Sequence, residues 1–226
     1  MEELRIKRSD IERIVLYGGR RRRTARQVYD SLEDKPDYII NAGLYDTASG
    51  ISTCDTIIDG ELINGGNYTD HGIAFGADTM RQMSTKLAID YKVPYFLGGS
   101  PTLVQSGCVD IDQKGLTPGF LAAKAVRIGV GFDANDLIIC FPEAKCSIYA
   151  LADKMLDAGC RTAIACDGGG STSVMQAVDG RLTALNRRTE DRANSTWLLI
   201  YLKKGDGDTM PKVMLDAGHG QSDPGA

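Results

Sequence analysis

The clearest indication of fold in this chain is the stretch Thr162-Ala163-Ile164-Ala165-Cys166-Asp167-Gly168-Gly169-Gly170-Ser171. Thr162 to Cys166 is a short apolar run, which predicts a buried strand. The three glycines that follow Asp167 allow the backbone to approach a ligand closely. Their successive N–H groups can form a nest that binds an anion. A tight β-turn without a ligand is the alternative, because glycine clusters commonly mark turns.

The elements on both sides of this stretch are also readable. Apolar residues at helical spacing predict a helix from Ile148 to Ala158, which Ser147 caps at the start and Gly159 at the end. Downstream, two short strands at 174–178 and 182–185 flank Asp179-Gly180, the strongest hairpin signal in the sequence. No lysine follows the glycines and no helix is expected after them, which argues against a Walker loop and a dinucleotide fingerprint.

Similar patterns extend outward. A helix is predicted from Thr24 to Asp34, because its apolar residues share one face and Thr24 with Gln27 forms a capping box. Further strands are predicted at 38–40, 73–77, 94–97, 125–132, 137–141 and 197–202. We therefore expect an α+β fold of mixed β-sheets with flanking helices, as one main domain plus a short tail.

The composition excludes several classes. With 226 residues, 42% hydrophobic and 25% charged, the chain is an ordinary globular protein, and no apolar run is long enough to span a membrane. The net charge of −4 disfavours a nucleic-acid partner. Arg20 to Arg23 could contact phosphate, and a solvated loop is the alternative. The six cysteines lack C-x-x-C spacing and are expected to be buried thiols.

The chain divides into four predicted parts. Residues 1–35 are a basic segment with the first helix, 36–202 the main domain, 203–211 a polar linker and 212–226 the tail. No apolar stretch follows the first charges, so we expect no signal peptide.

Four motifs occur in an order that resembles the phosphodiester glycosidase family over about residues 36–202. They are Asn41-Ala42-Gly43-Leu44-Tyr45, Gly98-Gly99-Ser100-Pro101-Thr102-Leu103-Val104, Arg127-Ile128-Gly129-Val130-Gly131 and Cys166-Asp167-Gly168-Gly169-Gly170-Ser171. The family usually has glycine where this chain has Ala42, and threonine where it has Ile128. The resemblance implies a glycoside hydrolase of the phosphodiester glycosidase type, which cleaves a sugar-1-phosphodiester of the N-acetylglucosamine-1-phosphate kind.

The chemistry of that bond agrees with the residues. A phosphate monoester is a weak base, so the leaving group needs anion stabilisation more than protonation. Arg127 and Arg192 could supply it, and Asp167 could activate water or stabilise an oxocarbenium-like centre. The predicted catalytic residues are Asp167, Arg127 and Asn41. The predicted substrate-binding residues are Gly43, Tyr45, Gly99, Gly168, Gly169, Gly170, Ser171 and Arg192. No cofactor is expected for the main domain.

Each candidate has a structural alternative. Asp167 could only close a turn by accepting backbone N–H bonds. Arg127 could be a structural ion-pair partner, and Asn41 could be a turn residue in the left-handed conformation. His71 could be a loop residue or a general acid.

A second resemblance covers Lys212 to Ala226, which is similar to the opening strand and loop of zinc-dependent N-acetylmuramoyl-L-alanine amidases. There, His219 would be the first zinc ligand. His71 is the only other histidine, so a three-ligand catalytic zinc site cannot be completed and no amidase activity is expected. Zinc is expected only for the missing amidase domain. We expect the apolar run 213–215 to pair with a sheet edge.

Together the two resemblances imply a hydrolase that acts on bacterial envelope glycopolymers, as part of a phage or bacterial cell-wall lysin. It would be made in the bacterial cytoplasm without a signal peptide and would act at the cell envelope if released. A non-catalytic glycopolymer-binding module that targets an amidase to the wall is the alternative. The replacement of a glycine usual in the family by Ala42 is the one feature that favours this alternative. The expected partner is a sugar-phosphate polymer or a small sugar phosphodiester. No nucleic acid and no membrane span are expected, and an oligomer is possible.

Overall fold

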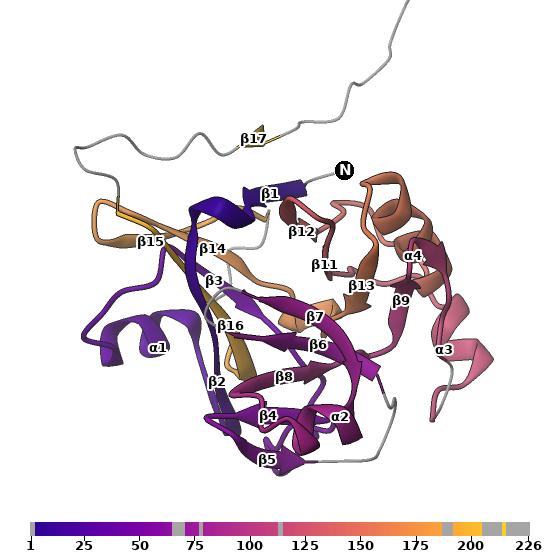
Figure 1. Cartoon of the computed structure of the whole chain (residues 1–226), viewed down its shortest axis with the longest axis horizontal. Helices are drawn as coiled ribbons and strands as arrows, with labels where there is room; N and C mark the ends of the chain where they lie inside the picture. The colour runs from indigo at the N-terminus through magenta and orange to yellow at the C-terminus, as the bar shows by residue number, and fades with distance from the viewer. Residues whose placement is uncertain are drawn as a thin grey trace, which may run out of the picture.

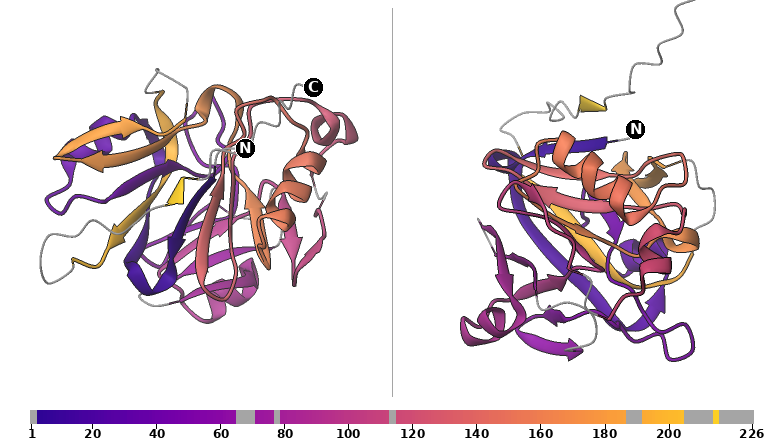
Figure 2. Two further views of the ribbon diagram at one scale, coloured as in Figure 1. Left: turned by 90° about the horizontal axis from the view of Figure 1, so that it is seen from above. Right: turned by 90° about the vertical axis from the view of Figure 1, so that its right-hand side faces the viewer.

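The computed structural model describes residues 3–64, 71–76, 79–112, 115–186 and 192–204, together with the backbone of 214–215. These residues form three β-sheets with a few short helices (Figures 1 and 2). The α+β class is confirmed in this coarse form, although the fold is predominantly β. Every strand pair between described residues is antiparallel, where mixed sheets were expected.

The first sheet has the strand order β10-β9-β13-β11-β12-β1-β17. Its strands are β1 (Glu3–Lys7), β9 (Thr102–Gln105), β10 (Cys108–Val109), β11 (Gly129–Phe132), β12 (Asp136–Cys140), β13 (Thr162–Ala165) and β17 (Met214–Leu215). Helix α4 (Ile148–Asp157) packs on one face, and α3 (Pro118–Ala122) contacts α4. Gly129 leaves room for the α4 side chain Met155, since a Cβ there would lie 2.7 Å from its sulfur.

The second sheet has the order β15-β14-β3-β16-β2. Its strands are β2 (Ile11–Arg23), β3 (Tyr38–Asn41), β14 (Val174–Val178), β15 (Arg181–Ala184) and β16 (Asn194–Leu202). Helix α1 (Ala25–Ser31) covers its outer face, where Trp197 is fully buried. The 3-10 turn η1 (Arg8–Asp10) joins β1 to β2.

The third sheet has the order β5-β4-β8-β6-β7, with helix α2 (Thr85–Asp90) against it. Its strands are β4 (Thr56–Ile58), β5 (Glu61–Asn64), β6 (His71–Phe75), β7 (Met80–Ser84) and β8 (Tyr95–Gly98).

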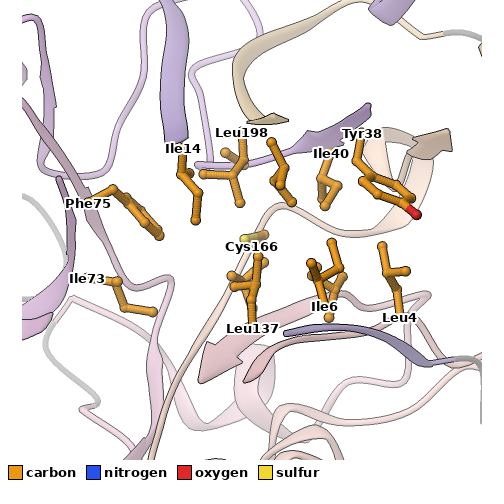
Figure 3. Packing of buried hydrophobic residues seen from close by; sticks show 14 of the residues in the cluster. Leu4, Ile6, Ile14, Tyr38, Ile40, Ile73, Phe75, Leu137, Cys166 and Leu198 are labelled. Carbon is orange, nitrogen blue, oxygen red and sulfur yellow. The ribbon is translucent and has the colours of Figure 1, made fainter. Parts of the chain in front are cut away.

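The largest hydrophobic core lies between the three sheets (Figure 3). Ile6 and Leu137 of the first sheet face Ile40 and Leu198 of the second, and the third sheet adds side chains such as Phe75. Cys166 lies within this core, immediately after β13. The residue after it, Asp167, is therefore placed where two sheets meet.

The local predictions near the glycine run are confirmed. Helix α4 begins after the Ser147 cap, whose side chain accepts from the amide of Ala150. Asp179 and Gly180 form the hairpin tip with positive φ angles of 49° and 74°. At α1 the capping box of Thr24 and Gln27 is present, although the helix ends at Ser31 and not at Asp34. The strand predicted at 125–132 begins only at Gly129.

The N-terminal segment is part of the sheets and not a separate basic arm. β1 pairs with β12, and β2 pairs with β16 over most of its length. Ile11, Ile14 and Leu16 are buried. Arg20 to Arg23 lie at the end of β2, so the solvated-loop interpretation is wrong for their backbone, although all four side chains are exposed.

The strand predicted at 213–215 appears as β17, which pairs with the edge strand β1 through Leu4 and Leu215 (Figure 1). This agrees with the expected edge pairing. Most of the predicted linker 203–211 and the proposed zinc ligand His219 lie outside the described residues. Among the described residues, no helix is both long and apolar enough to cross a membrane.

Candidate active site

Asp167 is fixed by its backbone at the junction of two sheets. β13 ends at Ala165, the amide of Cys166 binds the carbonyl of Ile128, and the amide of Asp167 binds the carbonyl of Ala42, at 2.7 Å. Gly168 follows in extended conformation, and a Cβ there would lie 2.5 Å from the carbonyl oxygen of Val126. Only glycine fits this position, because the neighbouring atom belongs to the backbone.

The rest of the glycine run forms a short 3-10 turn, η2 (Gly169–Ser171), in which Gly169 has a φ of +59°. The amide of Gly169 binds the carbonyl of Val126, and that of Ser171 binds the carbonyl of Gly168. These two N–H groups are therefore used within the protein. The Gly168 amide hydrogen-bonds to the Asp167 carboxyl group. Within the described part of the chain, the Gly170 amide is therefore the glycine N–H of the predicted anion nest that is left for a ligand.

Asn41, the last residue of β3, holds both ends of the segment from Asp167 to Ser173. Its side-chain nitrogen donates to the carbonyl of Asp167 at 2.6 Å, and its side-chain oxygen accepts from the amide of Ser173 at 2.7 Å. The residue is 1% exposed. It lies in a strand and not in a left-handed turn, so that alternative is wrong. Both of its polar atoms bind backbone, which suits positioning better than contact with substrate.

Two further asparagines hold the same segment, and the sequence analysis missed both. Asn194 donates to the carbonyl of Ser171 at 3.0 Å. Asn186 donates to the carbonyl of Thr172 and accepts from the amide of Val174, both at 3.1 Å. Asn194 begins β16 and Asn186 follows β15. Asparagine at a strand end is the only sequence signal for either residue, and it does not identify the partner.

The carboxyl group of Asp167 has a raised pKa. Burial is the main cause, because it disfavours the charged form. The Ser171 side chain and the Gly168 amide oppose this by hydrogen bonding, and the positive charges of Arg192 and Arg127 also act to lower the pKa. The net direction remains upward. The carboxyl group therefore lies in a drier environment than an ordinary surface aspartate.

Arg127 is buried close to this carboxyl group, with 6% of its surface exposed. Its Nη2 donates to the carbonyls of Phe120 and Ala123, at 3.3 and 3.0 Å, and its guanidinium lies 5.0 Å from the Phe120 ring centre. In the part of the chain that the structure describes, it forms no salt bridge, so the ion-pair alternative is not supported.

The buried charge of Arg127 is therefore only partly compensated. Its Nε is buried and has no hydrogen-bond partner among the described residues. Burial lowers the pKa of the guanidinium, and the nearby Asp167 acts in the opposite direction. A Cβ on Gly168 would lie 3.6 Å from the Arg127 Cδ, so the side chain runs alongside the glycine turn. An anion bound at the turn would complete the compensation of this cation.

The remaining candidates lie on segments around this centre. Gly43 packs against Leu97, Ser52 and Cys54, and the Tyr45 hydroxyl donates to the carbonyl of Ala193 at 3.4 Å. The Gly99 amide binds the carbonyl of His71, which lies in β6 and not in a loop. Arg192 is exposed and influences Asp167 through its charge.

The cysteines remain free, as expected, and five of the six are buried. Cys166 directly precedes Asp167, and burial raises the pKa of its thiol. Cys54 is also buried: its sulfur is 2.5 Å from the Ser100 hydroxyl, and burial raises its pKa to about 11. A thiol with this pKa is protonated at neutral pH, so it is a poor nucleophile. Among the described residues, no group of three or more His, Cys, Asp or Glu side chains could hold a metal ion.

The structure thus brings together Asp167, the glycine turn, Ser171, Arg127 and Asn41. Their contacts join β3, β13 and the segment before β11, which are far apart in sequence. The arrangement offers one desolvated carboxyl group next to a buried cation. These two groups suit a substrate in which an uncharged atom is next to an anionic group. The carboxyl group can act on the uncharged atom, and the cation can stabilise the anionic group.

The chain is similar to known proteins in sequence and in fold. Residues 34–201 match a family model described as phosphodiester glycosidase. The zebrafish N-acetylglucosamine-1-phosphodiester alpha-N-acetylglucosaminidase catalytic domain, auto-inhibited by its pro-peptide, superimposes with a TM-score of 0.66 at 20% identity, over 86% of this chain and 73% of that one.

A hypothetical protein from Synechocystis superimposes with a TM-score of 0.65 at 13% identity, over 84% of this chain and 56% of that one. At these identities the two structures show a shared fold. No curated protein matches the chain.

Proposed function

Because the chain belongs to the phosphodiester glycosidase family, we propose that it hydrolyses the bond between the anomeric carbon of a sugar and a phosphodiester. The observation that carries this proposal is the proximity of the half-buried Asp167 carboxyl, whose pKa is raised, to the buried and only partly compensated Arg127. The zebrafish protein's name contains N-acetylglucosamine-1-phosphodiester, and we propose the same type of linkage here.

In this mechanism Asp167 supplies the catalytic carboxylate. The departing group is a phosphate monoester, which leaves as a stable anion without needing a proton from the enzyme. Asp167 activates the attacking water or stabilises positive charge at the anomeric carbon. Arg127, Arg192 and the Gly170 amide stabilise the negative charge on the phosphate. Ser171 hydrogen-bonds to Asp167 and orients it.

The substrate assay is direct. We expect the purified protein to release N-acetylglucosamine from methyl-N-acetylglucosamine-1-phosphate or UDP-N-acetylglucosamine, measured as free sugar. Binding of these compounds without release would contradict hydrolysis and favour the alternative, a glycopolymer-binding module that targets an amidase to the wall.

The presence of Ala42, which favours the binding module, does not argue against hydrolysis. Ala42 replaces a glycine that is usual in the family, but its side chain is 1% exposed and packs in the central core. Its contribution near the site is the carbonyl that accepts from Asp167. That carbonyl is present whether the residue is alanine or glycine. The substitution therefore leaves the proposed chemistry possible.

The pH dependence follows from the raised pKa of Asp167. Because the carboxylate is the active form, kcat/KM is expected to rise with pH, with a midpoint above the ordinary aspartate value of 3.8. Arg192→Gln removes a charge that lowers this pKa, so the midpoint should move to higher pH. A pH–rate profile of both proteins tests this. An activity that falls as pH rises through this range would instead assign Asp167 as an acid.

The biological setting is also a proposal. The tail from Lys212 to Ala226 resembles the start of a zinc-dependent amidase, which supports a role in a phage or bacterial cell-wall lysin that acts on envelope glycopolymers. Zinc would belong to that second domain, through His219. The 226-residue chain itself is expected to bind zinc weakly and to lack amidase activity.

A further inference from the structure

A bulge connects the run Arg20 to Arg23 to the candidate active site through the start of β16. In the pairing of β16 with β2, Asn194 lies opposite Arg23 and Thr196 lies opposite Gly18. Four residues of β2, 19–22, therefore stand opposite the single residue Ser195. Bulges of this kind bend a strand and redirect its side chains, and they are common beside active sites.

A short series of contacts connects the bulge to Asp167. A Cβ on Gly50 would lie 3.3 Å from the Arg22 Cγ, and the carbonyl of Gly50 accepts from the Ser195 hydroxyl at 2.7 Å. The next residue, Asn194, binds the carbonyl of Ser171 in the active-site turn. The end of β2 and the glycine turn thus share the start of β16 as their common support.

The arginines of the bulge differ in whether a neighbouring group binds or neutralises their positive charge. Arg20 forms an exposed ion pair with Glu61 at 2.5 Å, and Arg23 donates to the Tyr17 hydroxyl at 2.9 Å. Arg21 and Arg22 are exposed and form no salt bridge in the described part of the chain. Arg192 adds a further positive charge, two residues before the partner of Arg23.

This local positive charge is unusual for the molecule, because the whole chain has a net charge of −4. An acidic protein repels an extended polyanion except where cations gather. The cations here are connected, through the start of β16 and through Arg192, to the site proposed to act on a phosphodiester. A ligand with a phosphate at the glycine turn and further phosphates along its length would match this arrangement.

We propose that Arg21, Arg22 and Arg192 form an extension of the active site that binds further phosphates of a linear sugar-phosphate polymer. This rests on the proposed function and narrows its substrate class from any sugar phosphodiester to a polyanionic one. A small phosphodiester would occupy only the region of Asp167 and Arg127. A polymer would also contact the bulge.

The test uses sodium polyphosphate of about twenty units as the polyanion. The double variant Arg21→Gln and Arg22→Gln should bind it about tenfold more weakly than the original protein in calorimetry at low salt. The slope of log Kd against log salt should also decrease by about one to two, because fewer counterions are released. Polyphosphate should inhibit hydrolysis of methyl-N-acetylglucosamine-1-phosphate competitively, and about tenfold less strongly in the variant.

The matched control removes two exposed arginines at the opposite ends of strands that lead to the site. Arg161 precedes β13 and Arg181 begins β15 beside the hairpin tip, so Arg161→Gln with Arg181→Gln should bind polyphosphate like the original protein. Equal weakening in both double variants would show a non-specific charge effect and overturn the proposal. Unchanged binding in the first variant, or polyphosphate binding without competition, would also overturn it.

Two further outcomes separate the hypotheses. Equally tight binding of the single-stranded oligonucleotide dT20 would identify a nucleic-acid surface and overturn the assignment to a sugar-phosphate polymer. Absence of sugar release from every substrate would contradict the proposed hydrolase, and with it the substrate assignment. In that case the calorimetry still decides whether the bulge binds polyanions.

Discussion

Asp167→Asn is expected to lower kcat for sugar release by about a thousandfold or more, without loss of fold. General-base catalysis by a positioned carboxylate contributes about 10²- to 10⁴-fold, and asparagine cannot accept the proton or carry the negative charge. The backbone of residue 167 is held by the carbonyl of Ala42 and the side chain of Asn41, neither of which needs the carboxylate. The turn should therefore survive the substitution.

The direction in which Asp167→Asn changes the stability of the fold can also be predicted. Burial raises the pKa of Asp167 in the folded protein above its unfolded value. The stability that this group contributes is present at low pH and is lost as pH rises through the folded pKa. At neutral pH the ionised carboxyl therefore weakens the fold. Asp167→Asn should have an unchanged or higher Tm at pH 7, measured by thermal unfolding.

A matched control separates catalysis from turn closure. Asp133 accepts the amides of Asn135 and Asp136, both at 2.7 Å, in the turn between β11 and β12. Asp133→Asn should leave kcat unchanged. An unchanged rate in Asp167→Asn would remove its catalytic role. A marked fall in its Tm would instead support the interpretation that Asp167 only closes the turn.

The elements that were predicted correctly are those whose signals are local. Helix α4 has its apolar stripe and its Ser147 cap within one short segment, and the hairpin tip requires only Asp179 and Gly180. β2 was missed, because its alternating Ile14 and Leu16 are followed by four arginines that suggest a solvated segment. Its identity as a strand depends on β16, which lies far away in the sequence.

The candidate site shows the same difference between local signals and contacts that join residues far apart in the sequence. Asp167 and its glycines were identifiable because a carboxylate before a glycine run is a compact pattern. Asn41 was selected, but its partners lie 126 and 132 residues away, so its positioning role was not visible. Asn194 was not selected at all, since its contact with Ser171 exists only after two sheets have assembled. Sequence alone therefore indicated the candidate reactive groups more readily than the residues that hold them.

The role of Asn41 in holding the segment from Asp167 to Ser173 can be tested with the variant Asn41→Ala. For this variant we expect a loss of about 2–4 kcal/mol in the free energy of unfolding. The substitution removes two short hydrogen bonds and leaves the Asp167 carbonyl and the Ser173 amide without their partner in a site that is 1% exposed. Each buried, unsatisfied group costs about 1–3 kcal/mol. For a domain of this size the Tm should fall by about 5–15 °C.

Activity and a matched variant complete this test. Asn186→Ala removes a similar pair of bonds, to Thr172 and Val174, but Asn186 is only half-buried, so water can replace them and the Tm should fall less. Asn41→Ala should also lower kcat more than Asn186→Ala, because Asn41 holds Asp167 itself. If Asn41→Ala kept its Tm and lost only affinity for substrate, Asn41 would contact the substrate directly, and its assignment as the residue that positions Asp167 would be wrong.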